Sequence, residues 1–146
     1  MNEVKEEQIK KLNNVLHNIY KNFKKLNANV EAELFEGITG TELSIIGTIG
    51  NTPGVKMKDI CERLQLPAST LTNVIDRLER RDLLKRVMSK QDRRSFVLEL
   101  TQAGVVVYDK HKNAERIIFE TILGALEDDK EREAFIDSLE KISNGM

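Results

Sequence analysis

The apolar residues of this 146-residue chain recur mostly at helical spacing, in blocks separated by polar or glycine-containing stretches. The first block predicts an amphipathic helix over residues 4–26, with one stripe of apolar side chains: Ile9, Leu12, Leu16, Ile19, Tyr20, Phe23 and Leu26. No partner surface for this stripe lies nearby in the sequence, so we expect it to pack against a distant helix or a second subunit. Residues 27–40 show no clear period and are predicted to form a connection, with a turn of helix around Val30–Phe35.

The middle of the chain predicts three further helices. Thr41, followed three residues on by Ser44, makes a helix start, and Gly50, Asn51, Pro53 and Gly54 stop that helix. A short helix is expected over Met57–Leu64. The next helix begins at Pro67, whose missing N–H is not needed in a first turn. Two helices joined by such a tight turn are typical of a helix-turn-helix.

The helix that starts at Pro67 has two different sides. Its apolar side predicts the buried face: Leu71, Val74, Ile75 and Leu78. Its other side is polar without being uniformly charged: Ser69, Thr70, Thr72, Asn73, Asp76, Arg77 and Arg80. A polar face of short hydrogen-bonding side chains is suited to the edges of DNA bases.

After Asp82 the pattern becomes extended. Residues 84–87 and 96–100 predict two strands, joined by a polar loop that is too long for a two-residue turn, and we interpret the pair as a projecting hairpin, or wing. A long helix should run from Thr101–Gly104 to about Leu126. Acidic residues then precede a last helix, in agreement with the preference for anions at helix N-termini: Glu127, Asp128 and Asp129.

The predicted fold class is mostly α with a small β-wing. The whole chain, 1–146, is expected to be a single domain in which a winged helix-turn-helix at 41–101 is flanked by terminal helices at 1–40 and 102–146. A hydrophobic content of 40% and a charged content of 32% agree with a folded, helix-rich protein.

Composition also narrows the function. A single cysteine excludes an intramolecular disulfide, and two isolated histidines provide no metal-site spacing, so no metal or other cofactor is expected. The N-terminus lacks the apolar stretch of a signal peptide, and no apolar run approaches the roughly 20 residues of a membrane span. No nucleophile with a base and no phosphate loop is recognisable. We therefore expect a cytoplasmic protein that is not an enzyme and has no membrane partner.

The net charge of −1 conceals an uneven distribution. From Arg77 to Ser95 there are eight basic and three acidic residues, a local charge of +5, whereas residues 27–55 contain four acids and no base. Such a run is often a solvated face, but its position at a helix end and a hairpin tip favours contact with nucleic acid.

These segments resemble the MarR family of bacterial transcription regulators. The stretch DICERLQLPASTLTNVIDRLERRDLL is similar to that family's helix-turn-helix, and SKQDRRSFVLELTQAG is similar to its wing, in which Asp-x-Arg precedes Leu-Thr and a glycine. The wing is the more specific match. The resemblance implies a homodimer joined through the terminal helices and repression by binding a pseudo-palindromic operator in double-stranded DNA, because two-fold symmetry sets two reading helices about one DNA turn apart.

The resemblance also assigns roles to residues. Ser69, Thr70, Thr72 and Asn73 would face the major groove, although helix capping is an alternative role for the first two. Basic residues would contact the backbone or the minor groove, with Arg94 in the groove itself: Arg77, Arg80, Lys90, Arg93 and Arg94. Asp92 would structure the wing by orienting an arginine.

The chain departs from the usual family pattern at three helix ends. Lys56 and Pro67 stand where a capping Ser or Thr is common, and Gln65 stands where a turn glycine is common. We expect Lys56 and Gln65 each to cost about 1 kcal/mol of stability.

Two further expectations concern ligands. The resemblance implies a pocket for a small anionic aromatic effector between the dimer helices and the winged helix. The residues expected to line it are His17, Tyr20, Tyr108 and His111. Tyr20 can equally be a core residue, and the histidines can be surface residues.

Cys61 is expected to pack as a small hydrophobe instead of sensing oxidants. The alternative function is a winged helix that associates with proteins and does not bind DNA.

Overall fold

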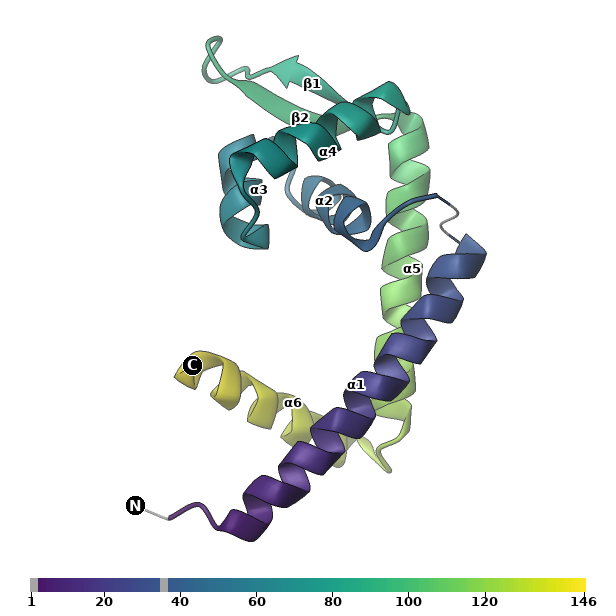
Figure 1. Cartoon of the computed structure of the whole chain (residues 1–146), viewed down its shortest axis with the longest axis vertical. Coiled ribbons are helices and arrows are strands. Elements are labelled where there is room, and N and C mark those ends of the chain that lie inside the picture. Colours follow the sequence, from purple (N-terminus) through teal and green to yellow (C-terminus); the bar gives the residue numbers. More distant parts are fainter. Residues whose placement is uncertain (1–2, 35–36) are drawn as a thin grey trace.

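Six helices and a two-stranded hairpin make up residues 3–34 and 37–146, the part of the chain that the computed structural model describes (Figure 1). In chain order they are α1 (Glu6–Leu34), α2 (Gly40–Asn51), α3 (Met57–Leu64), α4 (Ala68–Arg80), β1 (Leu84–Met88), β2 (Phe96–Leu100), α5 (Gln102–Gly124) and α6 (Asp129–Gly145). α2, α3, α4 and the hairpin form one lobe at the start of α5, and α1 crosses α5 obliquely, running in roughly the opposite direction (Figure 1). The predicted fold class, mostly α with a small β-wing, is confirmed.

The first helix is longer than predicted. α1 continues to Leu34, so the expected connection over residues 27–34 was wrong. This stretch is rich in Ala, Glu and Leu, which favour helix, and contains no Gly or Pro. Because each added residue of a nucleated helix gains a hydrogen bond, lost amphipathicity alone does not end it. The predicted turn around residues 30–35 extends partly into residues 35–36, which lie outside the described residues.

The second helix begins earlier than predicted. Its N-cap is Thr39, whose hydroxyl accepts a hydrogen bond from the Glu42 amide at 3.2 Å, while the Glu42 carboxylate accepts one from the Thr39 amide at 2.9 Å. This reciprocal capping box satisfies two amides at once. The predicted start at Thr41 and Ser44 was therefore wrong, and the Ser44 hydroxyl instead donates to the Gly40 carbonyl.

The predicted helix-turn-helix is present. α3 has the predicted bounds, and α4 begins one residue later than expected, with Pro67 as its N-cap. In the turn, Gln65 has φ 50° and ψ 44°, the left-handed conformation that favours glycine. The prediction of local strain at Gln65 agrees with this geometry. Lys56 caps α3 only through its backbone amide, which donates to Asp59.

The wing is an antiparallel pair of strands with the register Leu84↔Leu100, Arg86↔Leu98 and Met88↔Phe96. Leu84 and Leu98 are fully buried, so alternation places Arg86 on the inner face as well. Residues 89–95 form the loop between the strands. Both predicted strands are confirmed, the first with Met88 added.

The fifth helix starts tightly against the turn before the wing. The Thr101 hydroxyl accepts from the Gly104 amide at 3.0 Å and donates to the Asp82 carbonyl at 2.5 Å. A Cβ at Gly104 would lie 1.8 Å from the carbonyl oxygen of Leu83, so this close approach requires glycine. α5 ends at Gly124, two residues before the predicted Leu126.

The last helix is joined to α5 by a corner. Asp128 caps α6 by accepting from the Glu131 amide at 2.8 Å, as the acidic run at its head predicts. The Arg132 guanidinium donates to the carbonyls of Leu123 and Leu126, which closes the corner. In the described part of the chain, no helix combines the length and apolar character needed to cross a membrane.

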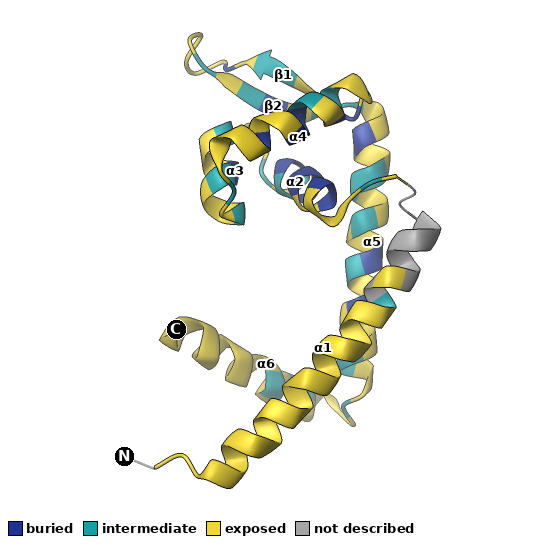
Figure 2. Cartoon of the chain, in the orientation of Figure 1, coloured by how far each residue is buried: buried dark blue, intermediate teal, exposed yellow. Residues whose placement is uncertain are grey.

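Burial differs sharply between the lobe and the terminal helices (Figure 2). The core of the lobe is formed by α2, α3, α4 and the wing: Ile45, Ile46, Ile49, Val55, Ile60, Leu71, Val74, Ile75, Leu78, Leu83, Leu84 and Leu98. Cys61 packs against this core, as expected of a small hydrophobe. Along α1, by contrast, most of the predicted apolar stripe is exposed: Ile9, Leu12, Leu16, Ile19, Tyr20 and Phe23.

Candidate nucleic-acid interface

The outer face of α4 presents short polar side chains to solvent. Ser69, Thr70, Thr72 and Asn73 are all exposed, and the opposite face of the helix is buried. The Thr72 hydroxyl donates a hydrogen bond to the Ala68 carbonyl at 2.9 Å, one turn back in the same helix. Within the described residues, the side chains of Ser69, Thr70 and Asn73 make no hydrogen bond, so their donors and acceptors remain available to a ligand.

Helix capping does not account for Ser69 or Thr70. The N-cap of α4 is Pro67, and no side chain forms a cap hydrogen bond at this end of the helix. The α4 N-terminus therefore combines amides without side-chain caps with exposed hydroxyls, an arrangement suited to phosphate oxygens and base edges.

The basic segment from Arg77 to Arg94 divides into two groups. Four of its eight bases are paired with carboxylates: Arg77 and Arg81 with Glu42, Arg86 with Asp76 and Glu79, and Lys85 with Glu99. The other four are exposed and form no ion pair in the described part of the chain: Arg80, Lys90, Arg93 and Arg94. Half of the basic residues are therefore paired within the lobe, and the other half are exposed to a partner.

The ion pairs of Glu42 with Arg77 and Arg81 form the more deeply buried cluster, and those of Arg86 with Asp76 and Glu79 form a second one. The Glu42 side chain is 4% exposed and accepts from Arg77 Nε at 3.3 Å, while Arg81 Nη1 lies 3.7 Å away and also donates to the Gly37 carbonyl at 2.8 Å. The cluster joins the segment before α2 to the end of α4. Arg77 was predicted to contact the DNA backbone, and the structure places its Nε on Glu42 with the side chain half exposed.

Asp92 structures the wing loop through the backbone. Its carboxylate accepts from the Arg94 amide at 3.0 Å, and its carbonyl accepts from the amide and hydroxyl of Ser95. The buried Ser89 hydroxyl accepts from the amides of Gln91 and Asp92. The family resemblance implies that Asp92 orients an arginine, and the contact found is with the Arg94 main chain. Lys90, Arg93 and Arg94 project from this closed turn.

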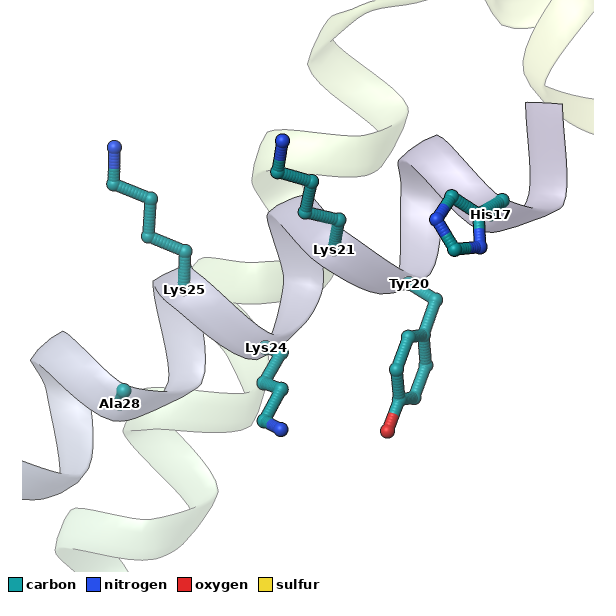
Figure 3. A pocket seen from close by; sticks show the side chains of 6 residues that line it. All are labelled: His17, Tyr20, Lys21, Lys24, Lys25 and Ala28. Carbon is teal, nitrogen blue, oxygen red and sulfur yellow. The ribbon is translucent and has the colours of Figure 1, made fainter. Parts of the chain in front are cut away.

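His17 and Tyr20, predicted to line an effector pocket, lie on a shallow hollow of α1 (Figure 3). The other residues that line it are Lys21, Lys24, Lys25 and Ala28. The three lysines give this part of α1 a positive charge: Lys24 extends on the same side of the helix as the Tyr20 ring, and Lys21 and Lys25 extend on the other (Figure 3).

Tyr108 and His111 lie elsewhere, on α5. Tyr108 covers Gly50, and its hydroxyl donates to Asn51 Oδ1 at 2.7 Å, in a hollow between α2, β2 and α5. His111 Nε2 lies 3.4 Å from Glu115 and packs against Gly47. One protomer therefore does not bring the four predicted effector residues into one pocket. No group of three or more metal-ligating side chains occurs among the described residues.

The sequence did not predict the two clusters of ion pairs, one around Glu42 and one around Arg86. The Thr39-x-x-Glu42 spacing of a capping box was visible and could have revealed the start of α2. Nothing in the sequence indicates that Arg86 reaches back to Asp76 and Glu79, because that contact depends on how the wing folds over α4.

Comparison with known proteins gives a consistent result. Residues 36–95 match the model of the MarR family. The repressor MdtR of Bacillus subtilis is 26% identical over 95 residues, 65% of this chain and 61% of MdtR. The regulator SarZ of Staphylococcus haemolyticus is 28% identical over 83 residues, 57% of this chain and 56% of SarZ. The chain thus aligns with less than two thirds of the length of each of these two relatives.

Solved structures extend the likeness over nearly the whole chain. Streptococcus pneumoniae FabT, solved in complex with DNA, has a TM-score of 0.81 and 26% identity and matches 93% of this chain and 95% of its own. Bacillus subtilis YusO has a TM-score of 0.68 and 21% identity, with 96% and 99% covered, and shares the fold. The match to the MarR family model covers residues 36–95, and the likeness to the DNA-bound FabT structure extends over nearly the whole chain.

Proposed function

We propose that this protein is a dimeric transcription regulator, acting as a repressor, that binds a pseudo-palindromic operator in double-stranded DNA. The observation that carries the proposal is the pairing of two surfaces in one lobe. The polar outer face of α4 has the short side chains that read base edges in the major groove, and the adjacent wing loop carries three exposed cations. Asn73 can pair with an adenine edge, and Arg94 can enter the minor groove.

The dimer follows from the uncovered apolar side chains of α1, α5 and α6. They are 36% or more exposed and include Leu12, Leu16, Ile19, Phe119, Leu139 and Ile142. An apolar surface of this extent is a mark of protein association, and a second copy of the chain is the occupant that the resemblance to dimeric regulators supports. Residues 1–40 and 102–146 would then form the dimer and orient two copies of the lobe at 41–101.

Selection from randomised duplex DNA tests this function. We expect an inverted repeat whose half-site centres lie about 34–36 Å apart, or a multiple of that, because each lobe reads one half-site. Binding to the selected site should weaken steeply with salt, since lysines and arginines release counterions from phosphates. No enrichment, together with salt-insensitive capture of protein partners, would instead establish the alternative, a protein-association module.

Two further parts of the proposal concern location and control. A regulator that acts on chromosomal DNA by binding works in the cytoplasm and without catalysis. A small anionic aromatic ligand is proposed as effector, supported by the lysines and Tyr20 around the α1 hollow. Titration of the protein–operator complex with benzoate and, as control, with a neutral benzamide tests it: release by the anion alone is expected, and equal effects of both compounds contradict it.

A further inference from the structure

A shallow hollow on α4 is lined by Asp76, Glu79 and Arg80, and Arg86 of β1 reaches its two carboxylates from the wing. Two carboxylates thus lie on the side of α4 that faces the wing. Both side chains are partly buried, unlike the exposed Ser69, Thr70, Thr72 and Asn73 of the same helix. Their position is unexpected for a surface that lies between two DNA-binding elements.

The geometry of duplex DNA decides what this hollow meets. When α4 lies in the major groove and the wing loop reaches the neighbouring minor groove, one sugar–phosphate backbone separates the two grooves. The surface between α4 and the wing must therefore face that backbone. Two unpaired carboxylates there would repel the phosphates, because juxtaposed like charges oppose association.

Arg86 lies on the inner face of β1 and binds both acids. Its Nη2 donates to Asp76 Oδ1 at 2.6 Å, its Nη1 donates to Glu79 Oε2, and its backbone amide donates to Glu79 Oε1 at 3.4 Å. The Arg86 side chain is 27% exposed, less than either partner. The hydrogen bond with Asp76 raises the pKa of the Arg86 guanidinium, and the negative charge of Glu79 raises it further against the effect of burial.

We propose that Arg86 is a charge-masking residue that neutralises Asp76 and Glu79, so that the hollow between α4 and the wing accepts the DNA backbone. With Arg80 beside it, the two acids and two bases of the hollow sum to zero charge. Arg86 acts through Asp76 and Glu79, because both terminal nitrogens of its guanidinium already donate to them. It is a positioning residue for the proposed DNA binding, on which this inference rests.

The test compares charge removal with charge rescue. Arg86→Gln should weaken binding of the selected operator by about tenfold or more, a factor of ten being about 1.4 kcal/mol. The triple variant Asp76→Asn, Glu79→Gln, Arg86→Gln should bind within about threefold of the wild type, a difference of about 0.7 kcal/mol, because no carboxylate remains to be masked. Lys85→Gln is the matched control: it removes the same charge from the same strand, but from the outer face, where Lys85 pairs with Glu99.

Several outcomes distinguish masking from other roles. If Arg86 contacted a phosphate directly, the triple variant would stay as weak as Arg86→Gln and lose about one unit of salt slope. If Arg86 only fastened the wing, Asp76→Asn with Glu79→Gln would weaken binding, whereas masking predicts unchanged or tighter binding. That double variant retains Arg86 and so tests the inference even if Arg86→Gln fails to fold. Wild-type protein that selects no DNA would refute the proposed function, and wild-type binding with unaffected Arg86→Gln would refute the masking role alone.

Discussion

The winged-helix lobe and the terminal helices carry equally regular apolar stripes, yet only the lobe covers its own. Leu78 of α4 is 0% exposed, whereas Leu16 of α1 is 54% exposed and Leu139 of α6 is 49% exposed. The difference lies in what packs opposite: α4 contacts α3 and β1 and shares its core with α2, whereas α1 contacts only part of α5. Helical periodicity thus identifies side chains that need a partner surface, but it does not say whether the same chain provides it.

Burial of the exposed apolar side chains would lower the free energy of the protein. Full burial of one aliphatic side chain stabilises a structure by about 1.5–3 kcal/mol. The exposed stripe of α1 therefore contains a driving force for association similar in kind to the one that already holds the lobe together. Changes in the terminal helices should act on assembly, and changes in the lobe should act on folding.

The largest expected effect is on assembly. Leu16→Glu places a charge in both halves of a two-fold interface and removes two buried side chains, so dimerisation should weaken by about 3–6 kcal/mol. Analytical ultracentrifugation should show monomer at concentrations where the wild type is dimeric. Asn18→Glu, on the opposite side of α1, is the control. A Leu16→Glu variant that remains dimeric would show that this stripe is not the interface.

A core substitution in the lobe should cost slightly less and act on folding. Ile75→Ala removes a side chain that is 0% exposed, so unfolding free energy should fall by about 2–5 kcal/mol. Urea denaturation at constant protein concentration measures this loss. The corresponding exposed site, Ile19→Ala, should shift the urea midpoint only at protein concentrations where dimers form. Equal shifts at all concentrations would remove the distinction between the two regions.

The wing loop is a third region, exposed like the terminal helices but polar. Arg94→Ala should weaken operator binding and lower the salt slope by about one unit, because one cation no longer meets the DNA. Unfolding should be unaffected, since Asp92 binds only the backbone amide of residue 94. A mobility-shift titration over a salt series checks it, and an unchanged slope would exclude Arg94 from the interface.

The smallest effect concerns a strained turn inside the well-packed region. Gln65→Gly relieves a left-handed conformation at φ 50° and should raise the unfolding free energy by up to about 1 kcal/mol. Thermal unfolding should show a small rise in Tm. Gln65→Ala, which cannot relieve the strain, is the control, and equal stability of the two variants would contradict this account.

Much of the fold was predictable because local chemistry specifies it. The bounds of α3, the buried face of α4 and both strands follow from spacing alone, and Thr101 and Asp128 cap the helices predicted to start there. The errors had two causes. Periodicity alone ended the first helix too early, because α1 continues past its apolar stripe, and the start signal of the second helix was assigned to Thr41 and Ser44 instead of the capping box of Thr39 and Glu42.

The candidate site was predictable only in part, for a physical reason. The sequence by itself determined which side chains of α4 and the wing are polar, basic or apolar, because each of these properties belongs to one residue and its near neighbours. Tertiary structure decided which charges remain available: Glu42 binds Arg77 and Arg81, and Asp76 and Glu79 bind Arg86, whereas the cations of the wing loop stay exposed. Ion pairing depends on distances of a few ångströms between segments far apart in the chain, and only the folded lobe sets those distances.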